Sequence, residues 1–354
     1  MNKVVLLAPT PPPAGGIAGW TKRMLEAELK NEWKVSVVDE KLIGSRELFG
    51  NKVKRSFFTE IKRCFRIWAN LISELKDSNT KVVHSCIPST TLGMLREYVC
   101  CCLTKKYNKR FIIHFRCTVP NTTQSKLGKK ILKKLCDKSD YIMLLNKQSG
   151  DFIEKITDTE FSIIPNFISE SEIVDRHEIR TEIKTVLYVG GVIESKGAID
   201  MLEVAKSFPS ISFRFVGNAP DNIISYANDN NINNAFFVGV KPKEEVKKEM
   251  QDADVFMFLT YFYGEGFSNA LAEAMAAGLP CIVTDWAANK DMIEDKGGVV
   301  VPVKTPELAK EALKDISDCK IRSMQSEFNI NKVRNQYIDK VVLDKYVDVY
   351  EHLA

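Results

Sequence analysis

The sequence of 354 residues lacks any apolar run of the roughly 20 residues that a membrane-spanning helix needs. Its first apolar run ends at Pro9, which is too early for a secretory signal peptide. The nine cysteines form no C-x-x-C pair, and three of them stand together at 100–102 in an apolar segment. These absences exclude a disulfide scaffold and a helical membrane protein, so we expect a cytoplasmic chain with reduced thiols.

Several catalytic and binding motifs are missing as well. The sequence has no G-x-S-x-G elbow, no P-loop and no cluster of His, Cys or Asp with the spacing of transition-metal ligands. It also has no nucleic-acid-binding motif, although half of it is strongly basic. We therefore expect neither an α/β-hydrolase, nor a P-loop nucleotidase, nor a zinc enzyme.

Length and charge both divide the chain in two. A chain of 354 residues exceeds the usual size of one core, which predicts two domains. Residues 1–165 carry 29 Lys and Arg against 16 Asp and Glu, whereas the remainder carries 21 against 30. This split predicts that the two domains meet different partners. For the basic half, we prefer an anionic membrane surface over nucleic acid.

The first domain begins with the pattern of a doubly wound sheet. Residues 3–8 predict a buried strand, a Pro/Gly loop follows, a helix is expected from about 20 to 29, and VSVVD predicts a second strand. Asp39 ends that strand where a dinucleotide-binding fold has its ribose-binding acid. The loop, however, contains AGGIAG and not G-x-G-x-x-G, which disfavours an NAD-dependent oxidoreductase.

Two segments of this half predict basic amphipathic helices. One spans residues 126–138, and the other has six apolar residues at helical spacing with five cations between them: Phe57, Ile61, Phe65, Trp68, Ile72 and Leu75, with Lys54, Arg55, Lys62, Arg63 and Arg66. These helices either cover a core and turn a cationic side to solvent, or rest on anionic lipid. The sequence leaves both interpretations open.

Three further strands are predicted at KVVHSC, FIIHF and YIMLL. His114 stands at the carboxyl end of the second of these, which is where open α/β sheets bind ligands. The alternative is a hydrogen-bonded structural histidine. Arg116 points to the same side if the strand stays extended, and is a weaker candidate for the site.

The most informative stretch is residues 264–285, GEGFSNALAEAMAAGLPCIVTD. Ser268 and Asn269 predict the cap of an Ala-rich helix, Gly278 predicts its end, and CIVT predicts a buried parallel strand. Glu265 precedes the helix, and Glu273 lies inside it. First-turn amides around Phe267 and Ser268 favour an anion, so two flanking acids suit a ligand with both phosphates and hydroxyls, such as a nucleotide sugar.

A second informative motif is YVGGVIESKG, residues 188–197. A strand leads into Gly190 and Gly191, whose lack of side chains lets a diphosphate approach the backbone. Lys196 then supplies a compact positive charge at the start of a helix. Alone, this motif is a weak signal, but the strand–helix alternation continues around it through VVVPV at 299–303.

The segment EGFSNALAEAMAAGLP resembles the E-x7-E signature of retaining glycosyltransferases of family 4, which have the GT-B fold. The resemblance implies an α/β protein of two Rossmann-like, doubly wound domains facing a cleft. SIIPNFI at 162–168 resembles the family's passage into the second domain. We therefore expect an acceptor-binding domain at 1–166, a nucleotide-sugar-binding domain at 167–334, and a C-terminal helix at 335–354 that crosses back to the first domain.

The resemblance also implies roles for residues. Glu265 and His114 would contact the donor sugar, Glu273 the ribose hydroxyls, and Lys196 the diphosphate. The remaining residues expected to bind substrate are Gly15, Gly16, Gly190, Gly191, Gly266, Phe267, Ser268 and Asn269. One position departs from the family pattern, because Gly191 stands where the family has an arginine.

The expected activity is transfer of a sugar, with retention, from a nucleotide-diphosphate sugar to a hydroxyl of a lipid-linked or polysaccharide glycan. Glu265, Lys196 and His114 are the expected catalytic residues, and the resemblance implies no metal or other cofactor. Asp252 and Asp254 are interpreted as capping a strand and not as a D-x-D metal motif. The charge split adds a peripheral location on the cytoplasmic face of a membrane. The alternative is a non-catalytic nucleotide-sugar-binding protein, because of Gly191.

Overall fold

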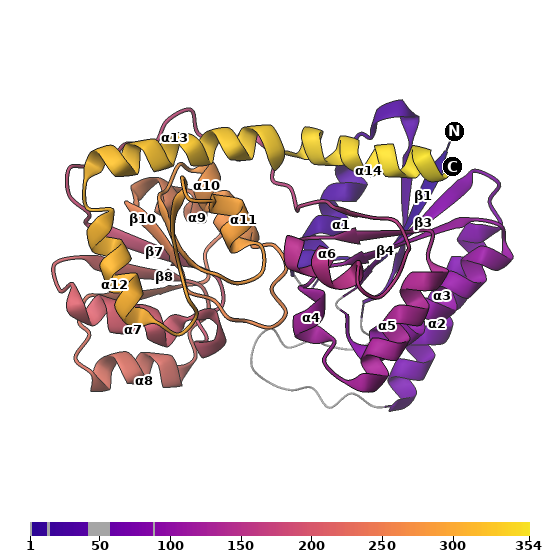
Figure 1. Cartoon of the computed structure of the whole chain (residues 1–354), viewed down its shortest axis with the longest axis horizontal. Helices are drawn as coiled ribbons and strands as arrows, with labels where there is room; N and C mark the ends of the chain where they lie inside the picture. The colour runs from indigo at the N-terminus through magenta and orange to yellow at the C-terminus, as the bar shows by residue number, and fades with distance from the viewer. Residues whose placement is uncertain (1, 13–14, 42–56, 88) are drawn as a thin grey trace. The chain divides into compact units, whose positions relative to one another are not determined.

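The computed structural model describes residues 2–12, 15–41, 57–87 and 89–354, so the predictions on Lys54 and Arg55 lie outside the described residues. The chain divides into two compact units. The first comprises Met1–Asn166 together with Val342–Ala354, and the second comprises Phe167–Val341. Each unit is a parallel sheet with helices on both faces (Figure 1), which confirms the predicted α/β fold class.

The first sheet has the strand order β2-β1-β3-β4-β5-β6, with every pair parallel. The strands are β1 (Lys3–Ala8), β2 (Lys34–Asp39), β3 (Thr80–Ile87), β4 (Arg110–Phe115), β5 (Tyr141–Leu144) and β6 (Phe161–Ile163). The order reverses between β1 and β3, and open sheets bind ligands at the carboxyl ends of the strands beside such a reversal.

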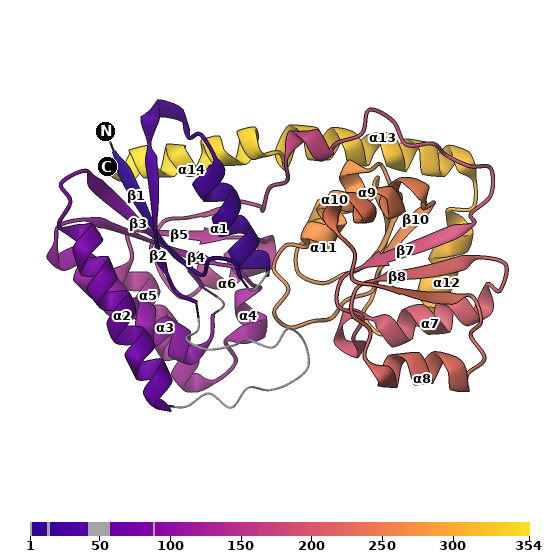
Figure 2. The same ribbon diagram turned by 180° about the vertical axis from the view of Figure 1, so that it is seen from behind.

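Two helical layers cover this sheet. On one face lie α2 (Phe57–Leu75), α3 (Thr91–Lys106) and α5 (Lys126–Lys138), which share one buried apolar core with the strands. On the other face lie α1 (Gly16–Glu26) and the C-terminal α14 (Asp339–Leu353), as Figure 2 shows from behind. The short helices α4 (Val119–Thr122) and α6 (Lys147–Ile153) follow β4 and β5.

Helix α2 faces the core with a different stripe from the predicted one. Ile67, Leu71 and Leu75 are fully or almost fully buried against the sheet. Ile61 and Phe65, in contrast, are 37% and 63% exposed. Ile61 and Phe65 therefore do not face the core, and the interpretation of α2 as a helix that covers a core holds only for its second half.

The second sheet has the order β12-β11-β10-β7-β8-β9, which is the 3-2-1-4-5-6 order of dinucleotide-binding folds. Its strands are β7 (Thr185–Val189), β8 (Ser212–Val216), β9 (Ala235–Gly239), β10 (Val255–Phe258), β11 (Cys281–Thr284) and β12 (Gly298–Val301). Its helices are α7 (Ala198–Ser207), α8 (Asp221–Asp229), α9 (Lys243–Asp252), α10 (Asn269–Ala276), α11 (Asn289–Ile293), α12 (Pro306–Asp315) and α13 (Cys319–Gln336). Here the order reverses between β7 and β10.

The last 36 residues differ from the single helix expected at 335–354. Helix α13 begins much earlier, at Cys319, and ends at Gln336. The backbone is not helical at Tyr337 and Ile338, and α14 starts at Asp339. The break has a local cause: Ile168 donates to the Tyr337 carbonyl and accepts from the Asp339 amide, so Ile338 pairs as a strand residue. None of the described helices combines the length and the apolar composition that crossing a bilayer needs.

Candidate functional site

Most of the predicted site lies in the second unit, where the strand order reverses. Because β7 and β10 are adjacent strands at this reversal, the segments that follow them meet at the carboxyl ends of the strands, where open α/β sheets bind ligands. Lys196 follows β7, and Glu265 follows β10. The topology thus brings together two motifs that are far apart in the sequence.

Two glycines allow the loops at this edge to approach each other. Gly197 has φ +79°, and a Cβ there would lie 2.3 Å from the carbonyl oxygen of Leu259 at the end of β10. Gly217, after β8, has φ +144°, and its Cβ would lie 1.8 Å from the Gly190 carbonyl oxygen. Any side chain at either position would force the backbones apart, because real Cβ atoms do not come that close.

The close approach at Gly197 places Lys196 beside the β10 loop. The Tyr261 amide donates to the Ser195 carbonyl over 2.9 Å, which joins the two loops directly. Lys196 Nζ lies 3.5 Å from Glu265 Oε2 and 5.5 Å from the centroid of the Phe262 ring. The two charged side chains are 25% and 12% exposed. A paired acid and base thus stand in a half-buried position, where charge interactions are stronger than in water.

Tyr188 lies near the carboxyl end of β7, although no role was predicted for it from the sequence. Its hydroxyl donates to the Gly191 carbonyl over 2.7 Å, so it fixes the glycine pair that follows β7. Burial, and then the Glu265 carboxylate, raise the pKa of Tyr188, which keeps the phenol protonated as a donor. The only available signal was an aromatic residue placed directly before Val-Gly-Gly.

Helix α10 has the predicted cap. The Ser268 side chain accepts from the Leu271 amide over 3.2 Å, and the Phe267 ring packs edge-on against Tyr337 at 5.2 Å. Glu273 lies half-buried in the second turn of the helix, in which five of the eight residues are buried. The helix ends at Ala276, and Gly278 follows in the left-handed conformation, as expected for a glycine stop.

The remaining predicted site residues are in the first unit. Gly15 and Gly16 are exposed and begin α1, where Gly15 is the N-cap. An added Cβ would meet nothing within 4 Å at either position, so no close contact requires these two glycines. The helix also begins four residues before the predicted start, because the Gly19 amide already donates to the Gly15 carbonyl.

His114 is completely buried in a chain of hydrogen bonds. Arg116 lies 3.2 Å from His114 Nε2, His114 Nδ1 lies 3.0 Å from His84 Nε2, and His84 Nδ1 lies 2.7 Å from the Tyr350 hydroxyl. An arginine can only donate, so Nε2 of His114 accepts and its Nδ1 carries the proton. His84 is fixed in the same tautomer, and it donates to Tyr350 of α14.

The surroundings keep both imidazoles neutral. Burial, with the Arg116 charge second, lowers the pKa of His84 to about 3 and that of His114 well below its usual value. Both ring nitrogens of His114 are occupied, and this favours the structural alternative considered above. A contact between His114 and a sugar stays a prediction.

Among the described residues, one group of three potential metal ligands lies close together, and it belongs to this cluster. The ligand atoms of His84, Cys86 and His114 lie within 4.8 Å of one another. The hydrogen-bond chain already accounts for this proximity, and the Arg116 guanidinium disfavours a cation there. Burial raises the pKa of the Cys86 thiol to about 12, so a thiolate ligand is not preformed.

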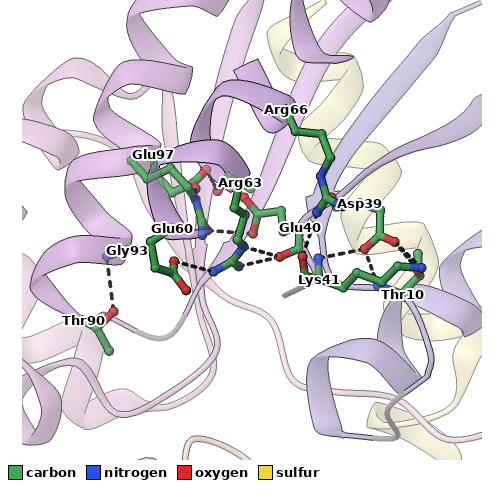
Figure 3. Close-up of polar contacts among 12 residues, drawn as sticks. Thr10, Asp39, Glu40, Lys41, Glu60, Arg63, Arg66, Thr90, Gly93 and Glu97 are labelled. Carbon is green, nitrogen blue, oxygen red and sulfur yellow. Dashed lines mark hydrogen bonds and ion pairs between the residues drawn. The ribbon is translucent and has the colours of Figure 1, made fainter. Parts of the chain in front are cut away.

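Asp254 and Asp39, two of the three acids that the sequence placed outside the site, have partners in the protein. Asp254 is 2% exposed, and its Oδ2 accepts from the amides of Lys184 and Thr185 at the start of β7. Asp39 accepts from the amide and the hydroxyl of Thr10, which ties the end of β2 to the loop after β1 (Figure 3). Both carboxylates therefore anchor strand ends.

Two arginines of α2 also bind the backbone at the end of β2. Arg63 donates to the Glu40 carbonyl and Arg66 to the Lys41 carbonyl, and both lie half-buried (Figure 3). Beneath them, Arg96 bridges Glu40 and Glu97 at 2.8 and 2.7 Å. Burial, and then the Glu97 charge, raise the pKa of Glu40 well above its usual range. The hypothesis that Arg63 and Arg66 face lipid is wrong.

Known proteins resemble the chain over part of its sequence. Residues 169–333 match the family model described as glycosyl transferases group 1. Spore coat protein SA of Bacillus subtilis (strain 168) is 24% identical over 204 residues, which are 50% of this chain and 52% of that protein. The putative teichuronic acid biosynthesis glycosyltransferase TuaC of the same strain is 21% identical over 229 residues, 59% and 57% of the two chains. The chain spans a little over half the length of these relatives.

Solved structures match over the whole chain. Sucrose-phosphate synthase (tll1590) from Thermosynechococcus elongatus superposes with a TM-score of 0.81 at 15% identity, covering 100% of this chain and 99% of that one. Anabaena Alr3699/HepE in complex with UDP-glucose superposes with a TM-score of 0.72 at 10% identity, covering 99% and 100%. Similarity at such low identity shows the fold, which is of the GT-B type.

Proposed function

We propose that this chain is a glycosyltransferase that moves a sugar from a nucleotide-diphosphate sugar to an acceptor hydroxyl. The observation that carries the proposal is the Lys196–Glu265 pair at the reversal of strand order, within the segment that matches glycosyl transferases group 1. A cation beside glycine loops suits a diphosphate, and an acid beside that cation suits the hydroxyls of the sugar attached to it.

In the proposed complex, the diphosphate lies along Gly190 and Gly191, between Lys196 and the positive end of α10. Glu265 orients the sugar, and Glu273 accepts from the ribose hydroxyls. Support for a nucleotide sugar comes from HepE, whose structure was solved in complex with UDP-glucose. Lys196 gains importance from Gly191, because the arginine that the resemblance leads one to expect is missing.

The proposed reaction retains the anomeric configuration. The acceptor hydroxyl attacks from the face that the leaving phosphate occupies, and this phosphate takes up the hydroxyl proton as the bond to the sugar breaks. Negative charge that develops on the phosphate is stabilised by Lys196 and by the first-turn amides of α10. These groups replace a metal in the proposal, so activity is expected to survive EDTA. Loss with EDTA that manganese or magnesium restores would contradict this.

The proposed acceptor is a lipid-linked or polysaccharide glycan, bound by the first unit. TuaC is named for teichuronic acid biosynthesis, and a further relative, the processive diacylglycerol alpha-glucosyltransferase of Acholeplasma laidlawii, is named for a lipid acceptor (25% identity over 162 residues, 45% of this chain and 48% of that one). The basic first half adds a peripheral location on the cytoplasmic face of an anionic membrane.

A second candidate function rests on Gly191. Without the expected arginine, the site could bind a nucleotide sugar and fail to stabilise the leaving group, as a non-catalytic binding protein would. Thermal unfolding with a panel of nucleotide sugars tests binding, because a ligand at a hundred times its Kd stabilises by roughly 2.7 kcal/mol. Release of nucleoside diphosphate tests turnover. Stabilisation by a nucleotide sugar without turnover on any acceptor would favour the second candidate, and stabilisation by NAD alone would contradict both.

A further inference from the structure

Exposed apolar side chains gather at one end of the helical layer in the first unit. Six large apolar residues in the first turns of α2, α3 and α5 are between 37% and 80% exposed. We call them the apolar tip patch: Phe58, Ile61, Phe65, Leu92, Leu95 and Leu127. Phe58 and Leu92, at 80% each, are among the most exposed large apolar residues of the described chain.

These residues form one surface because of the topology. Helices α2, α3 and α5 each follow a strand of the same parallel sheet and run back antiparallel to it, so all three start at the same edge. Neighbours in the layer touch, α2 with α3 and α3 with α5, and both views show them side by side (Figures 1 and 2). A Cβ at Gly128 would lie 3.3 Å from Thr91 Oγ1, which places the first turns of α3 and α5 in contact.

On α2, the patch lies beside the core-facing stripe. At 100° per residue, Phe58, Ile61 and Phe65 lie within about 60° of one another. Their mean direction is about 110° from that of the buried stripe of Ile67, Leu71 and Leu75, which packs on the sheet. The outward side of a surface helix is ordinarily polar. A contiguous exposed apolar patch marks a site of interaction with a protein or a membrane.

The charges beside the patch identify the kind of partner. Helix α5 carries exposed lysines through its first three turns: Lys126, Lys129, Lys130, Lys133 and Lys134. Of these, Lys133 pairs with Asp137, and for Lys129 and Lys130 no acid lies within ion-pair distance in the described part of the chain. On α2, Lys62 is exposed beside the patch. Exposed aromatic and aliphatic side chains flanked by long cationic ones suit the surface of an anionic bilayer. The apolar side chains can enter the boundary between headgroups and acyl chains, while the lysines reach the lipid phosphates.

We propose that the apolar tip patch inserts into an anionic lipid bilayer while the α5 lysines bind lipid phosphates. This goes beyond attraction by net charge, because it assigns the insertion to named side chains and removes Arg63 and Arg66 from the docking surface. It deepens the proposed function, since a docked first unit would meet a lipid-linked acceptor. The binding itself does not depend on catalysis.

The test uses the full chain and sedimentation with vesicles of phosphatidylcholine, alone or with phosphatidylglycerol. Phe58→Ser with Phe65→Ser is expected to lower the partition coefficient on anionic vesicles roughly tenfold or more, at low salt and at high salt alike. Lys129→Glu with Lys130→Glu is expected to weaken binding at low salt, with a difference that fades as salt screens the charges. The matched control is Val240→Ser with Met324→Ser, two residues of the second unit that are 76% and 72% exposed; it is expected to bind like the wild type.

Circular dichroism checks that each variant folds. Vesicle binding by the phenylalanine variant as tight as that of the control would overturn the proposal, as would no binding by the wild type. A wild-type dimer that this variant dissociates, in place of vesicle binding, would assign the patch to a second copy of the chain and also overturn it. Vesicle binding without turnover would contradict the proposed function alone, and turnover on a soluble acceptor without vesicle binding would contradict this inference alone.

Discussion

The two units share a doubly wound α/β architecture with different strand orders, and they use their polar residues in opposite ways. In the first unit, His84, His114 and Arg116 are buried beneath α14, and each has its polar atoms engaged. In the second, Lys196 and Glu265 stay partly exposed at the reversal of strand order. This difference indicates that the element packed over the polar groups decides whether they hold a helix or stay accessible to a ligand.

Glu265→Ala is expected to have the largest effect on activity. If Glu265 serves the reacting sugar, turnover is expected to fall roughly a hundredfold or more with a smaller change in donor affinity. Steady-state kinetics and donor titration measure the two effects separately. Turnover near that of the wild type would remove the central residue of the proposal.

Glu249 offers a matched control in the same unit. It forms a similarly buried ion pair, with Arg214 at 2.6 Å, and its side chain is 11% exposed against 12% for Glu265. Glu249→Ala is expected to reduce stability and leave turnover per folded molecule unchanged. An equal loss of turnover in both variants would mean that the effect of Glu265→Ala comes from folding.

Two glycine substitutions test whether the loop after the first strand is as closely packed in one unit as in the other. Gly197→Ala places a Cβ against the Leu259 carbonyl at a positive φ, so it is expected to lower the free energy of unfolding by about 2 kcal/mol or more. Gly16→Ala meets nothing within 4 Å at the start of a helix and is expected to be neutral or slightly stabilising. Urea unfolding checks both, and a Gly197→Ala protein of wild-type stability would show that the loops are not in close contact.

The sequence predicted the second unit well, because its signals are local. Helix capping at Ser268, the stop at Gly278 and the glycine pair at 190–191 each follow from the conformational preferences of a few neighbouring residues. The fold class followed from the alternation of strands and helices. No local signal showed that Tyr188 would fix Gly191 or that Lys196 would pair with Glu265, since both contacts depend on how strands are ordered in the sheet.

The first unit was predicted less well, because its decisive contacts join distant parts of the chain. His84 and Tyr350 are 266 residues apart, so nothing in the strand that contains His114 indicated that α14 would cover it. Similarly, the cations of α2 suggested a solvated or lipid-facing side until Arg63 and Arg66 were seen to bind backbone carbonyls at the end of β2. Periodicity identified the helix and not the side that it buries.

A third prediction concerns ligand affinity in the second unit. Glu273→Ala removes the proposed acceptor for the ribose hydroxyls and is expected to weaken nucleotide-sugar binding by roughly 1–3 kcal/mol. Calorimetric titration of donor measures this, and Glu273→Gln, which keeps one acceptor oxygen, is expected to recover part of the loss. Unchanged affinity in the alanine variant would place the ribose elsewhere.

The smallest effects come from two buried tyrosines, one in each unit. Tyr350→Phe leaves the His84 Nδ1 proton without its acceptor, and Tyr188→Phe leaves the Gly191 carbonyl without its donor. Each change is expected to cost about 1 kcal/mol of folding free energy, since one buried hydrogen bond is lost and the ring is kept.

The two variants should differ in function. Tyr188→Phe loosens the glycine pair beside the proposed diphosphate and is expected to raise the donor KM several-fold, whereas Tyr350→Phe affects only the attachment of α14 and should leave the donor KM unchanged. Urea unfolding and donor kinetics on both proteins check this, and the double variant should show additive losses of stability because the sites are in different units. A raised donor KM in Tyr350→Phe would mean that the buried chain from Tyr350 to Arg116 serves the ligand after all, and the contrast between the two edges would fail.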